Sequence, residues 1–113
     1  MDRCNLTKPQ KKICRELIDI ALQRECGKFI ESLSKAMTKN KKDEKSPYDS
    51  YIDVYKRVHN FDKKIARYFD DITGSKYFMT VFNLYMRKML TDKDLEIMDE
   101  EMYTEVMNMK TLF

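Results

Sequence analysis

Glycine and proline are scarce in this chain of 113 residues, which contains two of each. Because β-sheet proteins need many tight turns and helical bundles need few, this scarcity favours an all-α fold. No apolar run approaches the roughly 18 to 20 residues that span a bilayer, and the first residues lack the apolar core of a signal peptide. These absences predict a cytoplasmic protein with no membrane association.

The sequence is also poor in groups that carry out catalysis. It has one histidine and no tryptophan, and no H-E-x-x-H, P-loop, G-x-G-x-x-G or G-x-S-x-G motif. The best local combination is Tyr55, His59 and Asp62, which share one side of an expected helix and could support acid–base chemistry. No nucleophile or phosphate-binding loop accompanies it. We therefore predict a protein that is not an enzyme and holds no cofactor or metal.

The three cysteines do not form a recognisable site. They are an odd number without C-x-x-C spacing: Cys4, Cys14 and Cys26. The last two fall on one expected helix and would be about 18 Å apart at 1.5 Å per residue, which is beyond disulfide reach. Reduced thiols in a reducing compartment are expected.

Apolar residues recurring every three or four positions predict four amphipathic helices. We expect them at about 8–39, 47–72, 76–90 and 92–110, within a single domain of residues 1–113. The segment 39–46, KNKKDEKS, has no apolar residue, so a mobile polar loop is expected there.

Capping residues support these helix starts. The pairs are Thr7 with Gln10, Ser46 with Asp49, and Thr91 with Asp94. Inside the first helix, Gly27 predicts close approach to a neighbouring helix or a mild bend. Gly74 is expected to end the second helix with a positive φ.

The helix lengths and short connections predict a compact up-down four-helix bundle with two longer N-terminal helices and two shorter C-terminal ones. The excess length of the first two should protrude, unless the third crosses at an angle. An apolar seam on the second helix should pack on other helices. Its members are Tyr51, Val54, Val58, Phe61, Ile65, Tyr68 and Ile72. The third helix is apolar around most of its circumference and should be the most buried.

Charge is distributed unevenly. Residues 1–47 carry a net charge of +5, residues 48–90 carry +3, and residues 91–113 carry −5. The acidic end and the basic beginning either pack together or face different partners. High Lys, Tyr, Met and Asp content with little Ala or Gly is typical of an AT-rich genome and indicates a bacterial or phage source.

The favoured function is binding of another protein, or of a second copy of this chain, in a regulatory or accessory role. Methionine is common on surfaces that receive varied apolar partners, and seven of the nine methionines lie between Met79 and Met109. Four apolar residues fall off the inner stripe of the fourth helix: Ile97, Tyr103, Met107 and Leu112. They predict an exposed binding patch, either on that helix or in a groove between the second and fourth helices.

The alternative function is nucleic-acid binding by the first helix. Its first two turns carry a basic cluster: Lys8, Lys11, Lys12 and Arg15. Such a cluster could contact phosphates. Acidic residues interrupt the basic character from Glu16 onward, and no helix face with base-reading side chains is evident.

Overall fold

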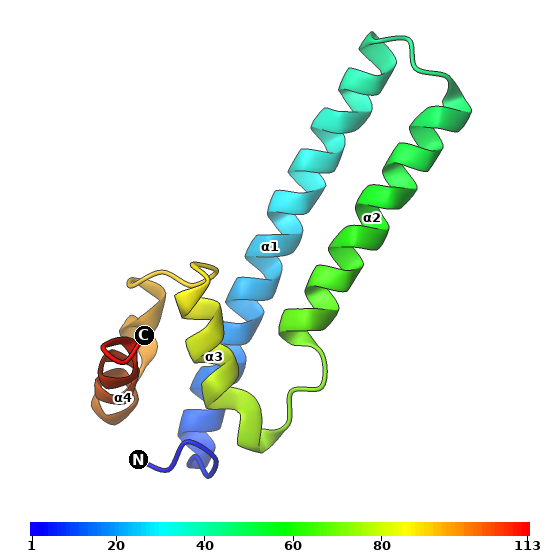
Figure 1. Cartoon of the computed structure of the whole chain (residues 1–113). Helices are drawn as coiled ribbons and strands as arrows, with labels where there is room; N and C mark the ends of the chain where they lie inside the picture. The colour runs from blue at the N-terminus through cyan, green and yellow to red at the C-terminus, as the bar shows by residue number, and fades with distance from the viewer.

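The computed structural model describes all 113 residues and contains helices but no strand (Figure 1). The elements are α1 (Lys8–Lys42), α2 (Pro47–Phe69), the 3-10 helix η1 (Gly74–Lys76), α3 (Tyr77–Met86), the 3-10 helix η2 (Asp94–Ile97) and α4 (Glu100–Lys110). The predicted all-α four-helix class, with two longer and two shorter helices, is confirmed. None of the helices combines the length and apolar character needed to cross a membrane.

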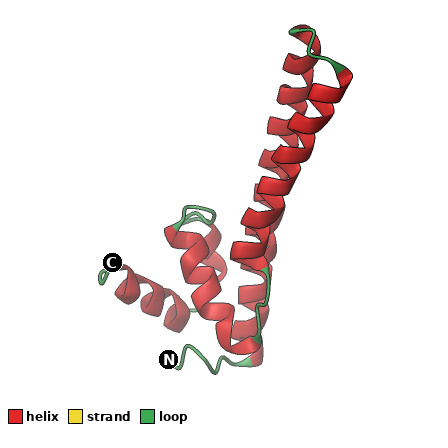
Figure 2. Cartoon of the chain, turned by 45° about the vertical axis from the view of Figure 1, so that its right-hand side comes forward, coloured by secondary structure: helices red, strands yellow, loops and turns green.

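The molecule has two parts, a packed base and a projecting arm (Figures 1 and 2). The arm is residues 25–64, where α1 and α2 run antiparallel beyond the other helices; the base is the remainder. The molecule measures 57 × 25 × 25 Å with a radius of gyration of 18.0 Å, whereas about 13 Å is usual for a compact domain of this length. The excess length of the first two helices therefore protrudes, which is the first of the two alternatives expected from the sequence.

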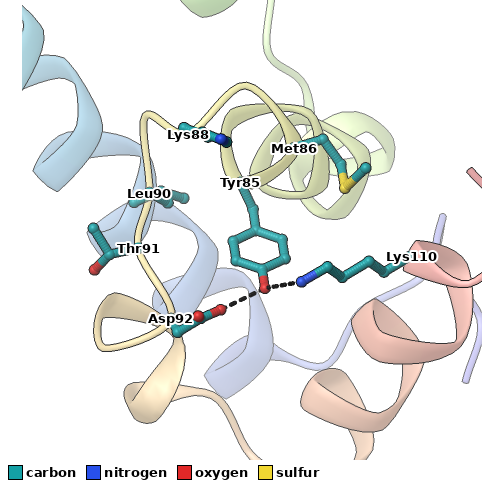
Figure 3. A pocket seen from close by; sticks show the side chains of 7 residues that line it. All are labelled: Tyr85, Met86, Lys88, Leu90, Thr91, Asp92 and Lys110. Carbon is teal, nitrogen blue, oxygen red and sulfur yellow. Dashed lines mark hydrogen bonds between the residues drawn. The ribbon is translucent and has the colours of Figure 1, made fainter.

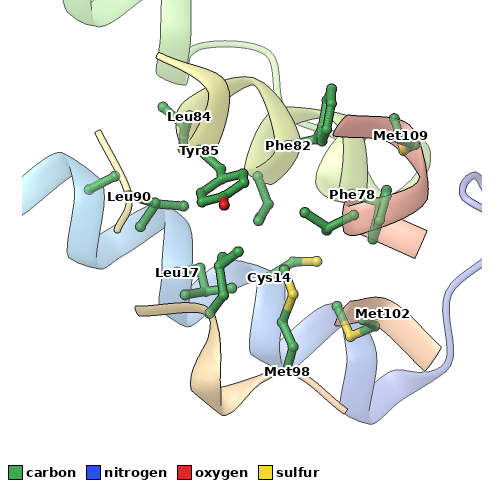
Figure 4. Packing of buried hydrophobic residues seen from close by; sticks show 14 of the residues in the cluster. Cys14, Leu17, Phe78, Phe82, Leu84, Tyr85, Leu90, Met98, Met102 and Met109 are labelled. Carbon is green, nitrogen blue, oxygen red and sulfur yellow. The ribbon is translucent and has the colours of Figure 1, made fainter. Parts of the chain in front are cut away.

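The hydrophobic core lies entirely in the base (Figure 4). The buried apolar residues are Leu6, Cys14, Leu17, Ala21, Phe78, Val81, Phe82, Leu84, Tyr85, Met89, Leu90, Leu95, Met98, Met102, Val106 and Met109. Half of the ten residues of α3 are buried, so the expectation that the third helix is the most buried is confirmed.

The apolar seam predicted for the second helix packs much less than expected. No residue of α2 is buried; Phe61, Ile65 and Tyr68 are half-buried, and Tyr51 and Val58 are exposed. The reason is length: ten residues of α3 rise about 15 Å, whereas the 23 residues of α2 rise about 35 Å. Most of α2 therefore extends past the helices that would cover it.

The predicted helix starts at Thr7 and Ser46 are confirmed. Thr7 Oγ1 accepts from the Gln10 amide at 3.3 Å while the Gln10 side chain accepts from the Thr7 amide at 3.0 Å. Ser46 Oγ accepts from the Asp49 amide at 3.1 Å. Each cap satisfies backbone donors that the first helical turn leaves without partners.

The predicted fourth helix divides in two. Thr91 and Asp94 form the expected reciprocal pair, at 2.7 and 3.2 Å, but it precedes the short η2. Met98 then takes an extended conformation, and Asp99 caps α4 by accepting from the Met102 amide at 2.8 Å. Because Asp99 caps a new helix, α4 starts at Glu100 and not at the predicted residue 92.

Other helix ends also differ from prediction. α1 continues to Lys42, α2 ends at Phe69 and α3 ends at Met86, so the first loop shortens to residues 43–46. Gly74 does not take a positive φ; that conformation is adopted by Glu44, Asp71 and Lys88. The turn that ends α2 is made by Asp71, which can occupy the left-handed region at modest cost.

The expected close approach at Gly27 is absent. Gly27 is exposed, and a Cβ added there would meet nothing within 4 Å. Because glycine in a helix interior costs backbone entropy, Gly27→Ala should raise the free energy of unfolding by about 0.5–1 kcal/mol. Urea denaturation followed by circular dichroism measures this change, and a loss of stability would contradict the open environment described here.

The oppositely charged ends of the chain do pack together. Arg3 forms an ion pair with Glu105 at 2.6 Å. The Gln10 side chain donates to Asp99 at 3.2 Å and to Glu101 at 3.5 Å. These contacts join the start of α1 to the acidic first turns of α4, so the packing alternative is confirmed.

The three cysteines differ in accessibility: Cys4 is exposed, Cys26 is half-buried and Cys14 is buried. Burial raises the pKa of Cys14 to about 12. Because the thiolate is the reactive form, Cys14 should resist Ellman's reagent at pH 8 until the protein unfolds, while Cys4 should react at once. Mass spectrometry of the partly labelled protein assigns the sites, and early labelling of Cys14 would contradict the prediction.

Candidate protein-binding surface

The arm is held together by a small number of specific contacts. The rings of Phe29 and Phe61 stack with centroids 4.1 Å apart and an interplanar angle of 5°. Nearer the base, the buried carboxylate of Glu25 accepts from Lys64 at 3.0 Å and pairs with Lys28 at 3.5 Å. Burial alone would raise the pKa of Glu25, but the two lysines outweigh it and lower that pKa.

A polar cluster fixes the tip of the arm. The buried Asn40 amide donates to Asp53 at 2.9 Å and to Ser50 at 3.4 Å, and Arg57 donates to the same Asp53 oxygen at 3.0 Å. The hydrogen bond from Asn40, followed by that from Arg57, lowers the pKa of Asp53. The polar composition of this segment predicted a loop, yet these contacts keep Asn40 within α1.

Large apolar side chains remain exposed along the arm. Ile30 and Tyr51 are each 61% exposed, and Met37, Tyr55 and Val58 are exposed as well. The sequence pattern placed Tyr51 and Val58 in a seam that should pack on other helices. The structure leaves both of these side chains, and Met37, without a covering element.

These side chains gather on one side of the arm. At about 100° per residue, Ile30 and Met37 lie roughly a quarter turn beyond the Phe29 side of α1 that contacts α2. Tyr51 and Val58 lie a similar angle beyond the Phe61 side of α2. Because the helices are antiparallel, these rotations lead to the same surface. We call it the arm face, and it comprises Cys26, Ile30, Leu33, Met37, Lys41, Tyr51, Val54, Tyr55, Val58 and Asp62, continued toward the base by Ile65.

The apolar patch predicted near the fourth helix has fewer exposed members than expected. Ile97, Tyr103 and Leu112 are exposed, whereas Met107 packs partly on the core. Tyr103 and Met107, four residues apart, share one side of α4, while Ile97 lies on η2. The groove expected between the second and fourth helices is not formed, because α1 and α3 stand between α2 and α4 (Figures 1 and 2).

The basic cluster of α1 is partly engaged within the protein. The Arg15 guanidinium lies 5.8 Å from the centroid of the Tyr77 ring, and the Lys11 side chain reaches Gly74. Lys8 and Lys12 are exposed. The four side chains do occupy one side of the first two turns. Their binding of phosphates stays a prediction.

The combination of Tyr55, His59 and Asp62 lies on the open surface of α2. The Tyr55 and His59 rings are parallel with centroids 6.0 Å apart, and no hydrogen bond joins either residue to Asp62. All three side chains are exposed. The four main pockets of the molecule are lined by other residues.

A pocket of about 430 Å³ lies beside α3 and α4 (Figure 3). Among the residues that line it, the Tyr85 hydroxyl donates to Asp92 at 2.5 Å and accepts from Lys110 at 3.0 Å. The hydrogen bond with Tyr85 raises the pKa of Lys110. The three polar groups satisfy one another and join α3 to α4 and to the segment between them, so this cluster acts as a structural clamp.

Sequence reasoning did not single out the arm face. The available signal was the mismatch in length between the first two helices and the last two, since side chains past the end of α3 lose their covering element. Comparison with protein-family models, curated proteins and solved structures finds no match.

Proposed function

We propose that this protein binds another protein through the arm face, in a regulatory or accessory role. The observation that carries the proposal is the row of exposed apolar side chains on one side of the arm: Ile30, Met37, Tyr51, Tyr55 and Val58. Contiguous exposed apolar surface is typical of interaction sites. Tyrosine and methionine are also enriched at interfaces, where they contribute large contact areas.

The shape of the molecule supports this proposal. The arm projects from the base, so its face is open to a large partner (Figure 2). The Phe29–Phe61 stack and the Glu25–Lys64 ion pair hold the two helices in register. A preorganised surface of this kind loses little conformational entropy on binding.

Site-specific photocross-linking tests the proposal. Benzoylphenylalanine placed at Tyr55 should give protein adducts in native lysate, because this position lies on the arm face. The same probe at Lys63, which is exposed on the other side of α2, should give few. Equal adducts from both positions, or none from Tyr55, would contradict binding through the arm face.

The experiment also separates the nucleic-acid alternative. Adducts formed through apolar contacts should persist after nuclease treatment and at high salt, because screening weakens charge contacts much more than apolar burial. Nucleic-acid binding by the cluster at Lys8, Lys11, Lys12 and Arg15 would instead be lost at high salt and would be insensitive to Tyr51→Glu.

A further inference from the structure

We infer that the arm face pairs with the arm face of a second copy of this chain, in an antiparallel arrangement about a two-fold axis. The inference rests on the proposed function and names its partner. Two arms joined in this way would form a four-helix bundle whose core contains side chains that are exposed in one copy alone. A two-fold interface uses the same patch on both subunits, so a single apolar face is sufficient.

The dimensions of the arm fit such an interface. The arm contains 18 residues of α2, 47–64, which rise about 27 Å, and two adjacent helices are about 20 Å wide. Each arm can therefore present about 540 Å² of surface to a partner, so a pair of arms would bury about 1,080 Å² in total, just above the roughly 1,000 Å² that a specific interface needs.

The charge of the arm face also favours its own copy as the partner. The protein as a whole has 36% charged residues, but the arm face has only two charged members, Lys41 and Asp62, and their charges are opposite in sign. A nearly neutral apolar surface is complemented by another of the same kind, and a strongly charged partner would have to lose hydration without gaining ion pairs. The protein's own arm face meets this requirement.

The base does not obstruct the pairing. On α1, Ile30 and Met37 point to the opposite side from Cys14, Leu17 and Ala21, which contact the core. The helices of the base therefore lie behind the arm face, and a second arm can approach from the front.

The tip determines the antiparallel direction. Four lysines lie within residues 39–46: Lys39, Lys41, Lys42 and Lys45. Arms paired with their tips together would bring two such groups side by side, whereas antiparallel arms place them at opposite ends. Val58 lies midway between Tyr51 and Ile65, so the axis should pass near Val58, and Tyr51 of one copy should lie against Ile65 of its partner.

Sedimentation equilibrium of the purified protein tests the pairing. We expect a dimer, and we expect Val58→Asp to raise the dissociation constant at least about tenfold because it buries an unpaired charge. The matched variant Lys63→Asp introduces the same residue on the other side of α2 and should leave the dissociation constant within about twofold of wild type. A monomer at 100 μM would overturn the inference.

Cysteine cross-linking tests the direction. In a background with Cys4→Ser and Cys26→Ser, Val58→Cys should form a disulfide between copies within minutes of adding diamide. Tyr51→Cys should not, because antiparallel arms separate its two copies by about 21 Å, whereas disulfide formation needs Cβ atoms about 4 Å apart. A dimer in which Val58→Cys stays reduced, or in which Tyr51→Cys is oxidised as quickly, would overturn the antiparallel arrangement about Val58.

The two proposals fail in different ways. If the purified protein is monomeric but the Tyr55 probe captures a different protein in lysate, the inference fails and the proposed function stands. If the protein is monomeric and the Tyr55 probe captures nothing, both fail. If the dimer forms but Val58→Asp leaves it intact, the copies associate through another surface and the inference fails, while the Tyr55 probe alone decides the proposed function. Circular dichroism of each variant confirms that the helical content is unchanged.

Discussion

Replacing Phe78 by alanine is expected to lower the free energy of unfolding by about 3–5 kcal/mol, the usual cost of removing a buried aromatic side chain. Phe78 is the largest fully buried side chain in the molecule and lies at the first turn of α3, among residues of α1 and α4 (Figure 4).

That cost is a large part of the total stability, since domains of this size are stable by only about 5–15 kcal/mol. Urea denaturation monitored by circular dichroism measures the effect. The control is Phe113→Ala: Phe113 is 80% exposed, and its ring reaches only the edge of the core, 5.8 Å from Phe82. Similar losses from the two variants would show that the core is not where the structure places it.

Removal of the Asp94 carboxylate should have the second largest effect, about 2–3 kcal/mol, because it breaks several charge-assisted hydrogen bonds at once. Both Asp94 oxygens accept from Arg24, at 2.8 and 3.1 Å, and one also accepts from the Thr91 amide. After Asp94→Ala, the partly buried Arg24 would keep only its bond to the Met89 carbonyl. Lys93→Ala, an exposed neighbour, is the matched control.

The same contact predicts a dependence of stability on pH. The hydrogen bonds from Arg24, supported by those at Thr91, hold the pKa of Asp94 well below its usual range against the opposing effect of desolvation. The folded state therefore favours the charged form, and this contribution is complete above the unfolded pKa of about 4. It is lost as the pH falls toward the folded value. Asp94→Ala should lose less stability than wild type between pH 5 and about 2, and parallel pH profiles would refute this assignment.

The sequence was most informative where the controlling interactions are local. The Thr7–Gln10 capping box depends on residues three positions apart, and both of its hydrogen bonds are present. The apolar periodicity of the third helix likewise predicted its burial. Such patterns depend on helix geometry alone, so they do not require knowledge of the surrounding fold.

Predictions failed where the outcome depends on distant residues. Asn40 is held in α1 by Asp53 across the tip, and nothing in the polar segment 39–46 indicates that partner. The exposure of Tyr51 and Val58 depends on where α3 ends. The apolar periodicity of the second helix carries no information about that position. The clamp of Tyr85 with Asp92 and Lys110 joins residues up to 25 positions apart, and no spacing rule identifies it.

The continuity of α1 couples the base mechanically to the arm. One helix of 35 residues belongs to both the base and the arm, so any tilt imposed where it packs on α3 is carried to the tip. With about 27 Å of α1 extending past residue 24, a tilt of 10° would move the tip by about 5 Å. Substitutions in the core at Leu17 or Ala21 can thus redirect the arm without touching it, and binding geometry can be adjusted from the opposite end of the molecule.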